Sequence, residues 1–228
     1  MSSSNILRNI FADKASLILR KMLASPNKKW VTRDFTDKNG VSLGMAHGVL
    51  ETMAKRGYIE RVKRGPDSYA LLTSKQDLVN AWLRAYRFEL NKVSTYYSPN
   101  KNILPKIKDY LKSKPYALTL HSGANLTTSF VITDHVYLYF SHEIWNKDFL
   151  NFCQHLDLKE LVRGGNIHII LPHYKKSIFY NVQMIKGYKV VSNLQLYLDL
   201  YNFIPRGQEH AEYLKQILEE KGKDLYES

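Results

Sequence analysis

The sequence predicts a mixed α+β fold with two domains, because two kinds of pattern follow one another along its 228 residues. Helix signals and a single hairpin fill roughly the first 72 residues, whereas strand and helix signals alternate after about residue 100. Residues 1–90 hold 16 Lys and Arg against 8 Asp and Glu, and residues 91–228 hold 17 against 13. We therefore expect a basic N-terminal domain with a linker helix over residues 1–90, and an α/β domain with a mixed sheet over residues 91–228.

The N-terminal domain begins with an amphipathic helix for which Asp13 is a suitable N-cap. Its apolar side chains recur at i, i+3, i+4 and i+7, at Ala15, Ile18, Leu19 and Met22. After a break at residues 25–30, a short helix is expected around RDFTDK, capped by Thr32 or Asp34. The turn signal Asn39-Gly40 ends it.

A third helix is predicted from Ser42, a good N-cap, to Gly57, a good residue just past a helix end. Its apolar positions repeat the same spacing, at Leu43, Ala46, Val49, Leu50 and Met53. Two short strands follow, YIERV (58–62) and YALL (69–72), joined by the turn KRGPDS (63–68). Ser74 then opens a linker helix that carries Leu78 and Trp82.

This order of elements resembles the winged helix-turn-helix family over about residues 13–72, in the stretch TRDFTDKNGVSLGMAHGVLETMAKRGYIERVKRGPDSYALL. The resemblance implies that the third helix enters the major groove of DNA and that the hairpin, the wing, lies along the backbone. The distribution of charge is consistent with this resemblance. Five basic residues and one acid, Glu60, lie in and just before the hairpin: Lys55, Arg56, Arg61, Lys63 and Arg64. Cations there gain binding energy by releasing the counterions condensed on duplex DNA.

The predicted partner is double-stranded DNA, and nine residues are expected to contact it. Phosphate contacts are expected from Lys55, Arg61, Lys63 and Arg64, with help from Thr32 and Arg33. Base contacts are expected from Ser42, Met45 and His47, none of which makes the bidentate contacts of Arg, Asn or Gln, so direct readout is modest. Gly44 and Gly48 are interpreted as sites of close backbone approach.

The second half alternates between strands and helices. Strands are expected at residues 116–120, 135–140, 166–171, 179–185 and 188–191, the last two joined at Lys186-Gly187. Helices are expected around residues 104–111 and 145–156, within HSGANLTTSF, from Ser192 onward, and over residues 208–221. The aromatic groups at Tyr137 and Tyr197 are interpreted as core packing, not as base-stacking platforms.

Two segments, YALTLHSGANLTTSF (116–130) and VVSNLQLYLDLYNFIPRGQEHAEYLKQIL (190–218), resemble the AbiEi-type antitoxins of type IV toxin–antitoxin systems. With the N-terminal pattern, the resemblance covers most of the chain. It implies an N-terminal domain that binds operator repeats and represses its own operon. It also implies a C-terminal domain that counters a nucleotidyltransferase-like toxin encoded beside it, without a stable complex being necessary.

The composition argues against a membrane protein, a secreted protein and a metalloprotein. No apolar run approaches the roughly 18 residues of a membrane span, and MSSSNILRNIFADK lacks a secretory pattern, so no membrane partner is expected. Cys153 is the single cysteine, which fits a reducing cytoplasm and predicts a buried, inert thiol. The eight histidines are scattered along the sequence without metal-ligand spacing, so no metal or other cofactor is expected.

The main enzymatic alternative is a metal-dependent nucleotidyltransferase. That chemistry needs closely spaced carboxylates, whereas Ser122-Gly123 is followed by Asp134 and then by His135-Val136 where a second acid is expected. The acid-rich pattern of a nuclease is also missing around FYNVQMIKGYKV. The sequence therefore predicts a DNA-binding regulator that is not an enzyme; a module whose winged domain binds another protein is the third alternative.

Overall fold

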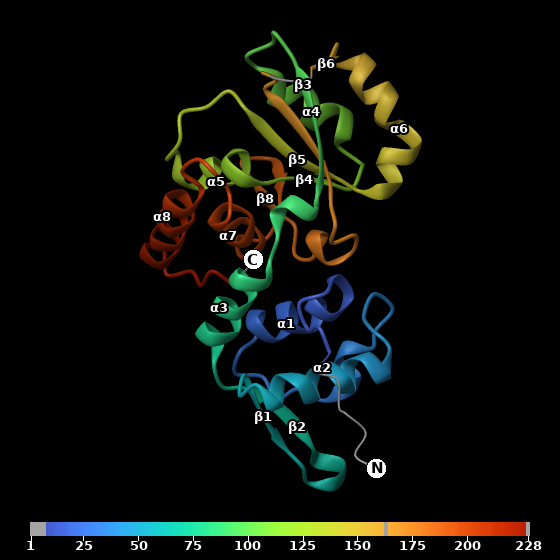
Figure 1. Ribbon diagram of the computed structural model, residues 1–228, viewed down its shortest axis with the longest axis vertical. Helices are drawn as coiled ribbons and strands as arrows, with labels where there is room; N and C mark the ends of the chain where they lie inside the picture. Colours follow the sequence, from blue (N-terminus) through green and yellow to red (C-terminus); the bar gives the residue numbers. More distant parts are fainter. Residues whose placement is uncertain (1–7, 162–163, 227–228) are drawn as a thin grey trace. The chain divides into compact units, whose positions relative to one another are not determined.

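The computed structural model describes residues 8–161 and 164–226 (Figure 1). The chain forms two compact units, Met1–Tyr86 and Arg87–Ser228, and each is described by itself. Part of the N-terminal stretch examined above for a secretory pattern lies outside the described residues. Within the described ranges, no helix combines the length and the apolar character needed to cross a bilayer.

The first unit contains three α-helices, two short 3₁₀ helices and a hairpin in its described part. In chain order they are α1 (Asp13–Ala24), η1 (Thr32–Phe35), α2 (Leu43–Lys55), β1 (Ile59–Val62), η2 (Gly65–Asp67), β2 (Tyr69–Leu72) and α3 (Lys75–Ala85). The β1–β2 hairpin extends away from the helices of this unit and carries η2 at its tip (Figure 1).

Several helix ends follow from local chemistry. The hydroxyl oxygen of Ser42 accepts a hydrogen bond from the Met45 N–H at 3.3 Å, so the predicted cap of α2 is confirmed. Gly57 has φ +75° just beyond the helix, a conformation that glycine adopts without a Cβ clash. The prediction for Asp13 is wrong, because α1 starts at Asp13 and Ala12 is its N-cap.

The short helix is a 3₁₀ turn whose N-cap is Val31, not Thr32 or Asp34. Asp34 contributes from inside the turn, since its Oδ2 accepts a hydrogen bond from the Val31 N–H at 3.1 Å. Asp34 thus stabilises the start of the 3₁₀ turn, and the side chain of the N-cap residue Val31 does not.

The core of the first unit uses the predicted apolar stripe of α2, which is buried at Ala46, Val49, Leu50 and Met53. Leu43 departs from that prediction: it is 56% exposed, because it occupies the first helical position on the solvent side. Arg20 of α1 is buried with its guanidinium 5.0 Å from the centre of the Trp82 ring of α3. This cation–π contact joins the first and last helices of the unit.

The hairpin has antiparallel register, with Ile59 opposite Leu72 and Val62 opposite Tyr69. Trp30 forms a bridge to Ala70 of β2, with N–H···O distances of 2.9 Å and 2.8 Å in the two directions. The sequence predicted only a break at residues 25–30, because a single bridging residue leaves no periodic pattern. The bridge joins β2, at the residue opposite Arg61, to the segment that leads into η1.

The second unit begins with η3 (Phe88–Leu90) and consists of a mixed sheet with helices on both faces. Its strands are β3 (Lys92–Tyr97), β4 (Tyr116–Leu118), β5 (Val136–Phe140), β6 (Lys159–Glu160), β7 (Ile167–Leu171), β8 (Gln183–Ile185) and β9 (Tyr188–Val190). Its longer helices are α4 (Ile103–Leu111), α5 (Leu120–Thr128), α6 (His142–His155), α7 (Asn193–Tyr201) and α8 (Gly207–Glu220), with the short η4 (Ser177–Phe179) before β8. The strand order is β6-β3-β7-β5-β4-β9-β8.

Strand pairing makes the sheet mixed. The pairs β5–β7 and β4–β9 are parallel, and the other described pairs are antiparallel. The predicted α+β class is thereby confirmed.

The two faces of the sheet can be read from β5, whose side chains alternate. Phe140 packs against Phe152 of α6, with ring centres 4.8 Å apart. Tyr139 points to the opposite face, where its hydroxyl donates to Asp199 of α7 at 3.1 Å. Helices α6 and α7 therefore cover opposite faces, and Tyr137 shares the α7 face.

Most predicted elements of this unit are present, with two kinds of error. The strands β4 and β8 are shorter than predicted, because Leu120 already begins α5 and residues 177–179 form the 3₁₀ turn η4. The strands β3 and β6 were not predicted at all. They are short or polar segments, which become strands only through pairing with residues far along the chain.

Candidate nucleic-acid interface

The start of α2 presents a polar, largely exposed surface. Ser42, Gly44 and His47 are exposed, and Met45 is half-buried. The Ser42 hydroxyl is engaged in the helix cap, so its first role is to hold the opening turn of the helix. Met45 and His47 are the other two residues predicted to contact bases, and their side chains take no part in the helix cap.

The two glycines of α2 differ from one another. A Cβ on Gly44 would meet nothing within 4 Å, so no neighbour in the described part of the chain requires a glycine at this position. A Cβ on Gly48 would lie 3.3 Å from Cζ of Arg8, so the neighbour there is a side chain and not a backbone. The backbone N–H of Arg8 donates to Thr52 Oγ1 at 3.3 Å, which holds this exposed cation against α2.

Lys55, at the end of α2, is partly neutralised. Its ammonium lies 3.0 Å from a carboxylate oxygen of Glu51, one turn earlier. The hydrogen bond from Lys55 lowers the pKa of Glu51, with smaller contributions from the charges of His47 and Arg61. Because both partners are well exposed, the ion pair is weak.

The hairpin holds the remaining cations. Arg61 is half-buried in β1, whereas Lys63 and Arg64 are exposed in the loop that leads to η2. Ser68 organises the tip: its hydroxyl accepts from the Arg64 N–H at 3.0 Å and donates to the Gly65 carbonyl at 2.7 Å. The loop therefore has internal hydrogen bonds, although its cationic side chains point into solvent.

A cleft of about 260 Å³ lies where the hairpin meets η1 and α2, and it brings together three of the predicted residues, Thr32, Arg61 and Lys63. The other lining residues are Trp30, Leu50, Val62, Ser68, Tyr69 and Ala70. Arg33 lies next to Thr32 in η1 and is exposed.

Sequence reasoning overlooked Lys29 and Arg8. Lys29 is exposed, and its ammonium lies 4.9 Å from the centre of the Tyr69 ring of β2. The pair KKW beside a break was a usable signal for Lys29, because a basic pair next to a strand of the cationic hairpin adds to the same positive potential. No local pattern indicated that Arg8 packs beside α2, since this contact spans about forty residues of sequence.

In the second unit, the structure pairs histidines that are far apart in sequence. His121 Nδ1 and His210 Nδ1 are 2.8 Å apart, and His135 Nδ1 and His168 Nε2 are 2.7 Å apart. Both pairs are stacked, and Tyr137 contacts both, at 4.4 Å from His168 and 6.5 Å from His121 between ring centres. Burial lowers the pKa of His168 and His210 to about 4 each.

These pairs do not make a metal site. Among the described residues, no three His, Cys, Asp or Glu side chains gather as a metal ion would need. Asp134, the acid of the nucleotidyltransferase alternative, is exposed, and its Oδ1 lies 4.0 Å from Nε2 of His135. Cys153 is half-buried, less than predicted, and burial raises the pKa of its thiol to about 11.

Comparison with protein families gives a match that covers most of the second unit. Residues 71–219 match the family described as transcriptional regulator, AbiEi antitoxin, type IV toxin–antitoxin system. The matched span starts inside β2, so it covers most of the second unit and more than half of the chain. Neither the comparison with curated proteins nor that with solved structures gives a match. The chain belongs to the AbiEi antitoxin family of transcriptional regulators from type IV toxin–antitoxin systems.

Proposed function

We propose that this protein is an autoregulating repressor that binds double-stranded DNA with its N-terminal unit, acts in the cytoplasm, and is not an enzyme. One observation supports the proposal most strongly. Leu50 of α2 lines the same small cleft as Arg61 and Lys63 of the hairpin, so a helix of groove-entering size stands beside the cationic hairpin, in which Arg64 follows Lys63.

The physical basis is complementary shape and charge. The major groove, about 12 Å wide, admits one α-helix, and the phosphates beside it carry a negative charge every ~1.7 Å of axis. Arg61, Lys63, Arg64 and Lys29 supply positive charge beside α2, and Thr32 and Arg33 supply donors from η1. Such cations set the register of the protein on DNA and most of its affinity, while α2 reads bases.

The proposal can be tested by fluorescence anisotropy with duplex DNA from the region upstream of the protein's own gene, over a range of salt concentrations. The variant Arg61→Glu, Lys63→Glu, Arg64→Glu should bind more weakly on every sequence. Its dependence on salt should fall by roughly one unit of slope for each lost phosphate contact. A matched variant, Lys14→Glu, Lys75→Glu, Arg84→Glu, changes the same charge on α1 and α3. An unchanged slope in the hairpin variant, or an equal loss in both variants, would refute a wing contact.

The antitoxin role is proposed for the second unit, against a nucleotidyltransferase-like toxin encoded beside the gene. Co-expression of the full chain should restore growth to cells that express that neighbouring reading frame. The hairpin variant should restore growth as well, because its substitutions lie in the first unit. Loss of rescue in that variant would place the antitoxin role in DNA binding instead.

Catalysis is tested directly by incubating the purified protein with labelled nucleoside triphosphates, magnesium and RNA. We expect no transfer, since a two-metal site requires a second carboxylate and the sequence has His135-Val136 after Asp134 where that acid is expected. Transfer that disappears in Asp134→Ala would establish the nucleotidyltransferase alternative.

A further inference from the structure

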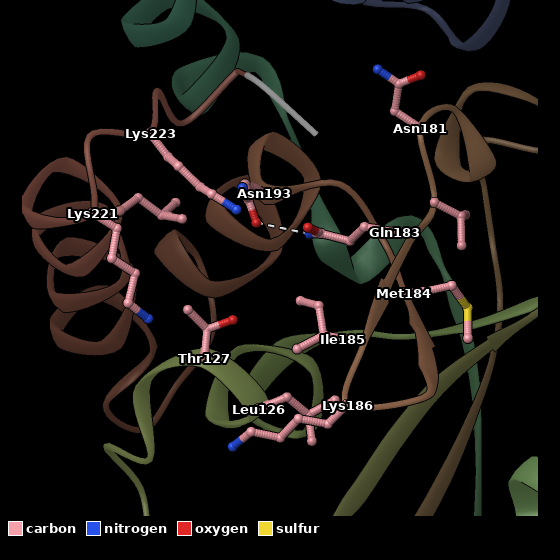
Figure 2. Close-up of a pocket in the computed structure, with 12 residues that line it drawn as sticks. Leu126, Thr127, Asn181, Gln183, Met184, Ile185, Lys186, Asn193, Lys221 and Lys223 are labelled. Carbon is pink, nitrogen blue, oxygen red and sulfur yellow. Dashed lines mark hydrogen bonds between the residues drawn. The ribbon is translucent and has the colours of Figure 1, made fainter.

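The second unit contains a cleft that none of the predicted roles uses. It has a volume of about 860 Å³ and lies between the β8–β9 hairpin and the C-terminal ends of α5 and α8 (Figure 2). Its polar lining includes Thr127, Gln183, Lys186, Asn193, Lys221 and Lys223. This volume lies within the range of about 300–1,000 Å³ that small-molecule sites occupy.

The charge of the cleft has one sign. Lys186 lines it from the β8–β9 turn and Lys221 and Lys223 line it from the end of α8, and the lining contains no Asp or Glu. In Figure 2, Lys221 and Lys223 extend from the α8 side, Lys186 lies at the turn of the hairpin, and Thr127 is between Lys221 and Lys186. Across the described part of the chain, no ion pair involves any of these three lysines.

Helix capping does not account for the lysines at the end of α8. The N–H of Gly222 donates to the Glu219 carbonyl and the N–H of Lys223 donates to the Leu218 carbonyl, both at 2.9 Å. With Gly222 at φ +66°, these bonds form a Schellman motif that satisfies the helix end with backbone groups alone. The ammonium groups of Lys221 and Lys223 are therefore available to the cleft.

Turn geometry does not account for Lys186 either. Lys186 and Gly187 have φ of +48° and +80°, which is the two-residue turn of a tight hairpin. Asn, Asp or Gly suits the first position of such a turn better than Lys, because the left-handed conformation strains a longer side chain. The backbone conformation thus gives no reason for a lysine here, whereas its charge complements the cleft.

One wall is held in place by hydrogen bonds. Gln183 Nε2 donates to the Val191 carbonyl at 2.9 Å and to Asn193 Oδ1 at 2.8 Å. Asn193 is itself buried at the start of α7. The hairpin side of the cleft is therefore tied to α7, so the polar lining is preorganised and not a chance grouping of mobile chains.

We propose that this cleft binds a ligand through two or more linked phosphate groups, supplied either by a nucleoside triphosphate or by the backbone of single-stranded RNA. Lysine ammonium groups bind phosphate as compact point charges, and the hydroxyl group of Thr127 can donate to a remaining phosphate oxygen. Such binding is separate from DNA binding by the first unit.

The test uses the full-length protein and isothermal titration calorimetry with inorganic tripolyphosphate, GTP and a 12-nucleotide single-stranded RNA. The cleft variant carries Lys186→Gln, Lys221→Gln and Lys223→Gln. The matched control carries Lys101→Gln, Lys112→Gln and Lys159→Gln, three exposed lysines outside the cleft. We expect tripolyphosphate to bind the wild type, the cleft variant to bind it at least about tenfold more weakly, and the control to bind it normally, since the cleft variant loses three charge-assisted contacts to phosphate.

Competition separates the two sources of phosphate. If GTP displaces tripolyphosphate and RNA does not, the ligand is a nucleotide; if RNA displaces it and binds more tightly, the ligand is a nucleic-acid backbone. The proposal is overturned if none of the three probes binds, or if the cleft and control variants lose affinity equally. The hairpin variant Arg61→Glu, Lys63→Glu, Arg64→Glu should keep its tripolyphosphate binding; loss of binding there would assign the phosphate site to the first unit.

Discussion

Thr119 Oγ1 donates a hydrogen bond of 2.5 Å to Asp199 Oδ2, although the two residues are 80 positions apart in the sequence. Asp199 is completely buried on α7, and its other oxygen accepts from Tyr139 OH at 3.1 Å and from Gln195 Nε2 at 2.7 Å. The carboxylate therefore joins the end of β4, the middle of β5 and one turn of α7. Hydrogen bonds of this kind offset the cost of burying an acid, and they also define how the helix docks on the sheet.

Substitution of Asp199 should destabilise the second unit strongly. Asp199→Ala leaves the Thr119 and Tyr139 hydroxyls and the Gln195 amide without this acceptor, and it also opens a small cavity. We expect the free energy of unfolding to fall by roughly 2–5 kcal/mol, measured by urea denaturation with circular dichroism. Thr119→Val keeps the shape and removes one donor, so its loss should be smaller, about 1–2 kcal/mol. Equal stability of Asp199→Ala and the wild type would mean that the network is not needed for folding.

The buried histidines predict acid sensitivity. Burial is the largest cause that lowers the pKa of His168 and His210 to about 4, and the neighbouring His135 and His121 lower them further. In the unfolded chain a histidine titrates near 6.5, so between about pH 6.5 and 4 the unfolded state binds more protons than the folded state. The free energy of unfolding should therefore decrease as the pH falls through this window, by up to about 3 kcal/mol for each histidine.

The measurement is urea denaturation at several pH values between 7.5 and 4 for the wild type and for the double variant His168→Gln, His210→Gln. The variant is expected to be less stable at neutral pH, but its stability should change less with pH. The slope, not the absolute stability, is the diagnostic quantity, since a glutamine does not titrate. An identical slope in both proteins would show that other groups cause the acid sensitivity.

Met45 and His47 should affect which DNA sequences are preferred, because they are the α2 side chains that the helix cap does not engage. Met45→Ala with His47→Ala should reduce the ratio between operator and random-sequence binding several-fold, while binding to random duplex stays nearly constant. Selection from a randomised DNA pool, followed by sequencing, measures this ratio. An equal loss of affinity on all sequences would argue that the two side chains contact only the backbone of DNA.

Removal of the acid beside Lys55 should strengthen DNA binding. Glu51 lies 3.0 Å from Lys55 and also interacts with the charges of His47 and Arg61. Glu51→Gln frees Lys55 for a phosphate and removes a repulsive charge, so affinity at low salt should rise by about two- to threefold and the gain should shrink at high salt. Asp77→Asn on α3 is the matched control and should leave affinity unchanged. Weaker binding by Glu51→Gln would indicate that the carboxylate itself contacts DNA or positions α2.

Cys153 should react slowly with alkylating agents. Burial, and to a lesser degree Glu160, raises the pKa of its thiol to about 11, and the thiolate is the reactive form. At pH 7.5 the folded protein should therefore react with iodoacetamide roughly 100-fold more slowly than the same protein in urea, as measured by mass spectrometry. Fast reaction of the folded protein would show an activated thiol in place of the inert one that the sequence predicts.

The sequence by itself determined the elements whose causes are local. Ser42 and Ser192 cap α2 and α7 as predicted, with Ser192 Oγ accepting from the Gln195 N–H at 3.3 Å. The apolar spacing of α2 predicted its buried face, and Lys186-Gly187 predicted the β8–β9 turn. Each of these features depends on residues within a few positions of one another, where backbone sterics and helical periodicity act directly.

Only the tertiary structure decided which distant residues meet. It pairs β3 with β7, adds Trp30 to the β1–β2 hairpin, places His121 against His210, and gathers three lysines around a cleft whose lining has no acids. None of these contacts leaves a periodic pattern, because the partners are brought together by the order of strands in the sheet and by helix docking on its faces. Local chemistry is sufficient to start and end an element, but the neighbours of a side chain depend on how the whole unit closes around its core.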